Sequence, residues 1–269
     1  MKKETYVITG AACGIGRALT ELLLSKNQHV HALDINEDKL TELEEWARKN
    51  DHKVSTRTID ITDCVAVETL IAEMEAREVR ISHWVNCAGV SGVGTFESLS
   101  AKDYERVLDL NLLSIVRSTR PILKHMQAQG KGKIVNLSSV AGFVPAPLMS
   151  AYNLTKHALV GFTRSMQAEM KYLDSPVQFV LVCPGFVETE MIRKGQDMGF
   201  PEWLSPLLST PENVAKEIFQ GLKKNKVEIF PTLNGKSMLL MYKHFPSLVT
   251  AQARLLTVKN WKDILLNRH

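Results

Sequence analysis

The chain of 269 residues is poor in cysteine and has no long uninterrupted apolar run. Its four cysteines form no Cys-x-x-Cys pair and have no partner histidines; they are Cys13, Cys64, Cys87 and Cys183. We therefore expect neither a disulfide framework nor a bound metal. Charged or strongly polar residues interrupt every stretch of 18 residues, so we expect no membrane-spanning helix.

Sequence features that mark a domain boundary or a targeting signal are also missing. The sequence has no linker rich in proline, serine or glycine, no internal repeat and no low-complexity segment, and Met1–Glu4 leads into a predicted strand without an apolar signal segment. Hydrophobic residues make up 45% of the chain and charged residues 23%, which is typical of a globular protein with a buried core. We expect a cytoplasmic protein, because unpaired cysteines suit a reducing compartment.

Short apolar, β-branched runs alternate with segments of helical periodicity. The predicted strands are Thr5–Thr9, His29–Leu33, Val54–Ile59, a strand that ends at Trp84–Asn86, Lys133–Leu137, Gln178–Val182 and Val227–Phe230. The long apolar stretch Tyr104–Met126 is among the predicted helical segments. This alternation predicts an α/β fold: a Rossmann-like, doubly wound, mainly parallel sheet of seven strands with helices on both faces.

A glycine-rich turn, Thr9–Gly16, follows the first predicted strand and precedes apolar residues at helical spacing. A strand, a tight turn and a helix N-terminus present backbone amides to a pyrophosphate. Three residues separate Gly10 from Gly14, so the spacing differs from the Gly-x-Gly-x-x-Gly pattern. The alternative is a glycine-rich connection that binds no ligand.

Asp34 follows the second predicted strand, where a carboxylate that binds a ribose is expected. The carboxylate would repel a 2′-phosphate by about 4 kcal/mol at 4 Å and an effective dielectric near 20. Neither Cys13 nor Ile35 offers a positive charge to offset this repulsion. We therefore expect NAD rather than NADP. The alternative is that Asp34 caps the next helix, although Asn36 is also placed for that role.

Ser139, Tyr152 and Lys156 carry the predicted chemistry. Ser139 closes the fifth predicted strand, and Tyr152 and Lys156 lie four residues apart on a helical segment, so both side chains face one direction. A tyrosine with a pKa near 10 is a poor base at neutral pH, and lowering it to about 7 requires roughly 4 kcal/mol. The Lys156 ammonium and the positive ring of NAD⁺ are expected to supply this stabilisation.

These motifs, with Asn86-Cys87-Ala88-Gly89, Asp60, Asn111 and Pro184-Gly185, resemble those of a short-chain dehydrogenase/reductase of the compact, single-domain type over residues 4–230. The resemblance implies that Tyr152 donates and accepts the proton while Lys156 lowers its pKa and holds the nicotinamide ribose. Ser139 would bond the substrate oxygen, and Asn111 would kink its helix and anchor a relay water. The expected catalytic residues are thus Asn111, Ser139, Tyr152 and Lys156.

The resemblance also implies the dinucleotide contacts: Asp60 at the adenine, the Ile15 amide at the pyrophosphate and Thr189 at the carboxamide, with Asn86 supporting the sheet. The full expected set is Gly10, Cys13, Gly14, Ile15, Gly16, Asp34, Asp60, Ile61, Asn86, Ala88, Gly89, Tyr152, Lys156, Pro184, Gly185, Val187 and Thr189. Two residues, Cys87 and Cys183, depart from the family pattern, and Cys13 and Cys87 are candidates for thiol sensitivity.

Less chemical interpretations of the same residues exist. Ser139 suits the end of a strand, Asn111 a helix cap and Asp60 a turn. A non-catalytic NAD-binding redox sensor would keep the same fold, and sugar-nucleotide epimerases share Tyr-x-x-x-Lys but differ in glycine spacing and domain size. The coincidence of all motifs in one chain favours an NAD(P)-dependent oxidoreductase.

Apolar segments are predicted to wall the substrate pocket. They include Val90, Val93, the stretch 143–149 and the loop 186–208 with Met191, Met198, Phe200, Trp203 and Leu204. Such a lining favours a lipophilic secondary alcohol or ketone. Arg193 and Lys194 leave a polar substrate open as an alternative.

The C-terminal part of the chain is strongly basic. From Gly221 to His269 it holds nine Lys/Arg and two acids, a net charge of +7. We expect a domain at 1–233 and a basic, amphipathic extension at 234–269 that acts as a lid, a dimer contact or, less favoured, a peripheral membrane element. The family resemblance implies a homodimer or homotetramer. We expect no nucleic-acid partner, since no base-stacking aromatics accompany the charge.

Overall fold

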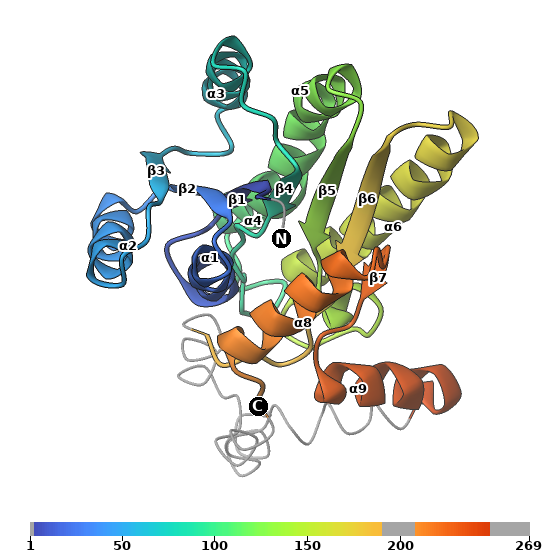
Figure 1. The fold of residues 1–269 in the computed structure, drawn as a ribbon. Coiled ribbons are helices and arrows are strands. Elements are labelled where there is room, and N and C mark those ends of the chain that lie inside the picture. Colours follow the sequence, from blue (N-terminus) through green and yellow to red (C-terminus); the bar gives the residue numbers. More distant parts are fainter. Residues whose placement is uncertain (1–2, 190–207, 248–269) are drawn as a thin grey trace.

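Seven parallel strands form one sheet in the computed structural model of the chain, which describes residues 3–189 and 208–247 (Figure 1). The strands are β1 (Thr5–Thr9), β2 (His29–Asp34), β3 (Ser55–Thr58), β4 (His83–Asn86), β5 (Gly132–Leu137), β6 (Val177–Val182) and β7 (Glu228–Ile229). Their order across the sheet is β3-β2-β1-β4-β5-β6-β7, and each neighbouring pair is parallel. The predicted fold class is confirmed.

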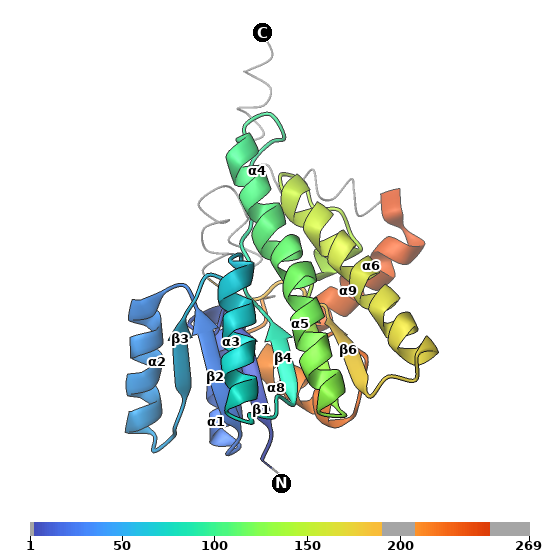
Figure 2. The same cartoon turned by 90° about the horizontal axis from the view of Figure 1, so that it is seen from above.

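Helices cover both faces of this sheet (Figures 1 and 2). One layer consists of α1 (Gly14–Ser25), α2 (Glu37–Lys49) and α8 (Pro211–Lys223), and the other of α3 (Cys64–Ala76), α4 (Ala101–Leu108), α5 (Ser114–Ala128) and α6 (Ser150–Tyr172). A short 3-10 turn at Val140–Gly142 follows β5, and α9 (Leu233–His244) follows β7. Right-handed crossovers between parallel strands require such helices on the faces of the sheet.

Alternate residues of each strand supply the two halves of the core. In β1, Tyr6 and Ile8 pack in the cluster that includes α1 and α8 side chains, whereas Val7 packs in the cluster under α3 and α5. Trp84 and Phe179, both almost fully buried, belong to the second cluster. Each such side chain contributes on the order of 2 kcal/mol through removal of apolar surface from water. The central strands therefore form continuous apolar runs because both faces are buried, whereas β3 is polar and largely exposed.

The long apolar stretch that begins at Tyr104 is not one regular helix. A π-helical turn at Asp109–Leu113 separates α4 from α5. Asn111 lies inside this turn and is fully buried. A π turn redirects the side chains that follow it, and it places the Asn111 carboxamide toward the carboxyl ends of the strands.

The strand order changes direction between β1 and β4. Thr9 at the end of β1 pairs with Asn86 at the end of β4. The Thr9 hydroxyl accepts hydrogen bonds from the amides of Cys87 (3.1 Å) and Ala88 (3.2 Å). In an open α/β sheet, ligands bind outside the carboxyl ends of the strands at this switch point.

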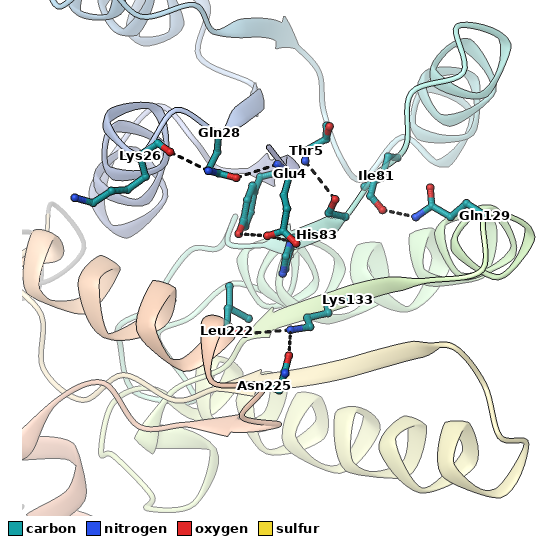
Figure 3. Close-up of polar contacts among 12 residues, drawn as sticks. Glu4, Thr5, Lys26, Gln28, Ile81, His83, Gln129, Lys133, Leu222 and Asn225 are labelled. Atoms are coloured by element: carbon teal, nitrogen blue, oxygen red, sulfur yellow. Dashed lines mark hydrogen bonds and ion pairs between the residues drawn. The ribbon is translucent and has the colours of Figure 1, made fainter. Parts of the chain in front are cut away.

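Polar contacts surround the N-terminal ends of the strands, at the end of the sheet opposite the glycine turn (Figure 3). The Glu4 amide donates to Gln28 Oε1 at 2.9 Å, and Lys133 Nζ donates to the Leu222 carbonyl at 3.0 Å and to Asn225 Oδ1 at 2.7 Å. His83 is buried here, and its ring stacks on Tyr6 with centroids 4.3 Å apart. These bonds connect Glu4 to the residue before β2, and β5 to the end of α8.

Within residues 3–189 and 208–247, no helix has the length and apolar character needed to cross a membrane. The same residues contain no cluster of three or more histidine, cysteine or acidic side chains placed to hold a metal ion.

Candidate active site

The glycine turn joins β1 to α1 in a conformation that few residues tolerate. Gly10 has φ +67°, and a Cβ there would lie 2.7 Å from the Cα of Ala88. Gly14 begins α1 with φ +53°. Cys13 stands at the N-cap position, and its side chain caps no backbone amide of the helix. The first-turn amides and the positive end of α1 therefore suit a phosphate group.

Asp34 lies against this turn at the end of β2. Its Oδ2 accepts a hydrogen bond from the Ala12 amide at 2.9 Å, and its Oδ1 accepts one from the Asn36 amide at 3.0 Å. Asn36, rather than Asp34, caps α2 through the Lys39 amide, so the alternative role of Asp34 as the helix cap is wrong. A carboxylate has about four acceptor positions, and two amides leave capacity for sugar hydroxyls.

Asp60 and Ile61 follow β3, where the adenine is expected. Asp60 is exposed, and its Oδ1 accepts hydrogen bonds from the amide (2.9 Å) and the hydroxyl (2.8 Å) of Thr62. Asp60 therefore does form the turn that the less chemical interpretation expected. The side chain of Ile61 packs in the core cluster under α3, so only its backbone is available to a ligand.

A buried chain of polar side chains links the central strands. Trp84 Nε1 donates to Asn86 Oδ1 at 2.9 Å, Asn86 Nδ2 donates to Asn136 Oδ1 at 2.8 Å, and Asn136 Nδ2 donates to the Thr163 hydroxyl at 3.0 Å. This arrangement ties β4 to β5 and to α6. Asn136 and Thr163 were missed by the sequence interpretation. The available signal was an amide residue within an otherwise apolar strand, which requires a hydrogen-bonding partner when buried.

Asn111 fixes the segment that follows β4. Its carboxamide accepts from the Val90 amide at 2.9 Å, donates to the Val90 carbonyl at 2.7 Å, and contacts the Thr155 hydroxyl at 3.4 Å. A Cβ on Gly89 would lie 3.1 Å from Asn111 Oδ1 and 3.9 Å from Lys156 Nζ. The alternative role of Asn111 as a helix cap is wrong, and the structure brings this side chain close to Lys156.

Lys156 and Tyr152 meet on one face of α6, next to the end of β5. Lys156 Nζ lies 5.4 Å from the centre of the Tyr152 ring and donates to the Leu137 carbonyl at 2.9 Å. The Ser139 hydroxyl hydrogen-bonds the Tyr152 hydroxyl and also contacts the Pro184 carbonyl at 3.4 Å. The trio that sequence analysis singled out is thus brought together at the carboxyl end of the sheet.

Burial shifts the pKa of both groups in the chain without a bound dinucleotide. Desolvation raises the pKa of Tyr152 to about 12, while the Ser139 hydrogen bond acts to lower it. Desolvation also lowers the pKa of Lys156 to about 8. The expected Tyr152 pKa near 7 included the positive charge of a bound dinucleotide, so it stays a prediction. In the chain alone, loss of hydration keeps the phenol protonated at neutral pH.

Two cysteines flank Lys156. Burial raises the pKa of Cys87 to about 12 and that of Cys183 to about 12, against the opposing effect of the lysine charge. A thiol is reactive as the thiolate, so the expectation of thiol sensitivity at Cys87 is disfavoured. Cys13 is exposed at the start of α1.

The segment after β6 approaches the glycine turn. The Pro184 carbonyl accepts from the Val140 amide at 2.9 Å, and Val187 forms a parallel bridge with Ser209. A Cβ on Gly14 would lie 3.4 Å from the Thr189 methyl group. The residues expected at the pyrophosphate and at the carboxamide are therefore adjacent.

The expected pocket wall is described in part. Val144 is fully buried and Phe143 packs against Phe230 with centroids 6.0 Å apart, so these two belong to the packing behind the site. Leu148 is partly exposed with φ +60°, and its carbonyl accepts from the Gly94 amide at 2.8 Å. The wall residues predicted in the loop, and the two cations of the polar-substrate alternative, lie outside the described residues: Met191, Met198, Phe200, Trp203 and Leu204, with Arg193 and Lys194.

Comparison with known proteins places this geometry in a family. Residues 4–198 match the family model described as short chain dehydrogenase. The chain is 32% identical over 243 residues to SadH of Mycobacterium tuberculosis, covering 87% of this chain and 88% of the relative. It is 30% identical over 214 residues to 2,3-dihydro-2,3-dihydroxybenzoate dehydrogenase of Bacillus subtilis, covering 80% and 76%.

Solved structures show the same fold. A short-chain dehydrogenase/reductase of Burkholderia phymatum in complex with NAD has a TM-score of 0.80 at 24% identity and covers 91% of this chain and 95% of its own. An alcohol dehydrogenase of Thermococcus sibiricus in complex with 5-hydroxy-NADP has a TM-score of 0.74 at 24% identity and covers 85% and 96%. The chain belongs to the short-chain dehydrogenase/reductase family of oxidoreductases.

Proposed function

We propose that this protein interconverts a lipophilic secondary alcohol and its ketone with NAD, and that Tyr152 is the general acid/base. The proposal is supported above all by the meeting of Ser139, Tyr152 and Lys156 beside a turn suited to a pyrophosphate. A hydride acceptor supplies the chemistry that amino-acid side chains lack. A phenol that hydrogen-bonds a neighbouring hydroxyl is placed to exchange a proton with a substrate oxygen.

In the oxidation direction, NAD⁺ held at the glycine turn would supply the acceptor for the hydride, and with it the two electrons, that the carbinol carbon loses. Tyr152, as the phenolate, takes the hydroxyl proton, and the alcohol becomes a ketone. Ser139 holds the substrate oxygen through its hydroxyl. The Lys156 ammonium stabilises the phenolate electrostatically, since it lies 5.4 Å from the ring centre. Asn111 keeps the Val90 backbone and α6 in register through its three contacts.

The preference for NAD over NADP rests on Asp34. Its carboxylate is next to the glycine turn and accepts a hydrogen bond from the Ala12 amide. A 2′-phosphate beside this carboxylate would face a like charge. The related structures hold NAD in one case and an NADP derivative in the other. Dissociation constants of NAD⁺ and NADP⁺ decide between them, and tighter binding of NADP⁺ would overturn this part of the proposal.

The lipophilic substrate class rests on the apolar residues near the site, of which Val90, Val93 and Leu148 are described and not fully buried. A panel of hydrophobic and charged alcohols and ketones tests it, with wild type beside Tyr152→Phe. We expect turnover of hydrophobic members and loss of turnover in the variant with cofactor binding kept. Cofactor binding without turnover of any substrate would favour the redox-sensor alternative.

Several further expectations stay predictions. They are the cytoplasmic location, the homodimer or homotetramer, and the division at residues 1–233 and 234–269. Helix α9 starts at Leu233 and thus begins one residue before the expected extension. Sedimentation of the purified protein tests the oligomeric state.

A further inference from the structure

The first turn of α9 is bonded to the backbone that follows β6. The Thr232 hydroxyl, which caps α9, accepts from the Gly185 amide at 2.9 Å and from the Gly235 amide at 3.2 Å. The Asn234 carboxamide accepts from the Phe186 amide at 3.2 Å and donates to the Phe186 carbonyl at 3.0 Å. These contacts join residues that are 47 and 48 positions apart in the chain.

The two backbones touch closely at this point. A Cβ on Gly185 would lie 2.7 Å from the Gly235 amide nitrogen and 2.7 Å from the Thr232 hydroxyl. A Cβ on Gly235 would lie 3.1 Å from the Gly185 Cα and 2.9 Å from Val140 Cγ1. Only hydrogen fits on either glycine, so the start of α9 packs directly against the Gly185–Phe186 backbone.

The Gly185–Phe186 backbone connects the reacting trio to the glycine turn. On one side, the Pro184 carbonyl contacts the Ser139 hydroxyl at 3.4 Å and the Val140 amide at 2.9 Å. On the other side, the chain continues through buried Val187 to Thr189, whose methyl group lies beside Gly14. A displacement at Phe186 is therefore transmitted toward both Ser139 and Thr189.

We propose that Asn234 is a positioning residue for the nicotinamide half of the dinucleotide and acts through the Phe186 backbone. This inference rests on the proposed function. A carboxamide suits the task because it carries both a donor and an acceptor and meets both backbone groups of one residue. Asn234 lies outside the segment 4–198 that matches the family model, so the role belongs to the C-terminal part of this chain.

The test compares two ligands that share the adenine and pyrophosphate but differ in the nicotinamide half. Dissociation constants of NAD⁺ and ADP are measured by calorimetry for full-length wild type, Asn234→Ala and Asn234→Asp. Loss of two hydrogen bonds predicts about tenfold weaker NAD⁺ binding in Asn234→Ala, with ADP binding within twofold of wild type. Asn234→Asp keeps the bond from the Phe186 amide and loses the donated one, so an intermediate effect is expected.

Asn225→Ala is the matched control, because Asn225 lies near the N-terminal ends of the strands and accepts a hydrogen bond from Lys133. It should change neither constant. Equal weakening of NAD⁺ binding and ADP binding in the Asn234 variants, or no change in either dissociation constant, overturns the inference.

Asn234→Asp keeps the size of the side chain and provides the measurement where the alanine variant does not fold. A wild type that binds ADP but not NAD⁺ would overturn the proposed function itself, a failure visible before any substitution.

Discussion

The Asp34 carboxylate and the Ala12 amide are joined by a 2.9 Å hydrogen bond across the top of β1 and β2. The side chain proposed to select the cofactor therefore also holds the turn proposed to receive the pyrophosphate. The proposed selection of NAD and the shape of this turn are coupled through one residue.

This coupling predicts two effects of Asp34→Ala. Loss of the carboxylate removes repulsion of a 2′-phosphate, which is worth up to about 4 kcal/mol at close range, so the NAD⁺/NADP⁺ affinity ratio should fall at least tenfold. Loss of the two hydrogen bonds that Asp34 accepts from backbone amides should also lower the free energy of unfolding by about 1 to 3 kcal/mol. Titration with both cofactors and urea denaturation measure the two effects. Asn36→Ala, which removes the α2 cap, should reduce stability without changing the ratio.

Gly10 and Gly161 form a pair with opposite expected outcomes. Gly10→Ala forces a side chain onto a left-handed residue and against Ala88, so the free energy of unfolding should fall by about 2 kcal/mol or more. Gly161 lies within α6, and a Cβ there meets nothing within 4 Å. Gly161→Ala should therefore raise stability by about 0.5 to 1 kcal/mol. Denaturant unfolding of both variants checks this, and equal effects at the two sites would contradict it.

Because His83 is buried, we expect the free energy of unfolding to fall in acid. Burial lowers the pKa of His83 to about 3, with Lys133 and Lys131 acting in the same direction; its Nδ1 lies 4.0 Å from Glu4 Oε2 (Figure 3). The unfolded chain, with a histidine pKa near 6.5, binds the proton first as the pH falls, so stability present above pH 6.5 is lost between pH 6.5 and 3. The His83 contribution to this loss between pH 8 and pH 5 is about 2 kcal/mol.

His83→Phe is the variant that isolates this effect, since a phenyl ring can stack on Tyr6 without a proton site. Urea unfolding at pH 8 and pH 5 should show a smaller difference in the variant than in wild type, by the amount assigned to His83. An identical pH dependence in the two proteins would show that other groups cause the acid loss.

The buried amides of Asn86 and Asn136 should be coupled energetically. Removing either one leaves the other buried without its 2.8 Å partner, which costs about 1 to 3 kcal/mol. Removing both with Asn86→Ala and Asn136→Ala should cost less than the sum of the single losses. A double-mutant cycle of unfolding free energies measures the coupling, and strictly additive losses would contradict a shared hydrogen bond.

The strands and the meeting of Tyr152 with Lys156 were predictable because their signals are local. Runs such as Thr5–Thr9 are apolar on both faces, and Tyr152 and Lys156 share a helical face through four-residue spacing. The contact between Asn234 and Phe186 joins residues 48 positions apart, and no periodicity in the sequence predicts it. The partners of Asn136 likewise depend on which strands become neighbours.

The titration of Tyr152 was the least predictable property of the site. Sequence spacing identifies the lysine that is expected to lower the pKa of the phenol, but desolvation, which raises that pKa, depends on packing by residues from several elements. In the chain alone desolvation dominates. The proposed chemistry therefore requires that dinucleotide binding changes the balance.

Ionisation of Tyr152 with and without NAD⁺ tests this requirement most directly. The phenolate absorbance of wild type minus that of Tyr152→Phe isolates this residue among the five tyrosines of the chain. The account predicts a pKa of about 12 without the dinucleotide and a fall of several units toward neutrality when NAD⁺ is bound. A Tyr152 pKa that stays at or above that of free tyrosine in the NAD⁺ complex would contradict it.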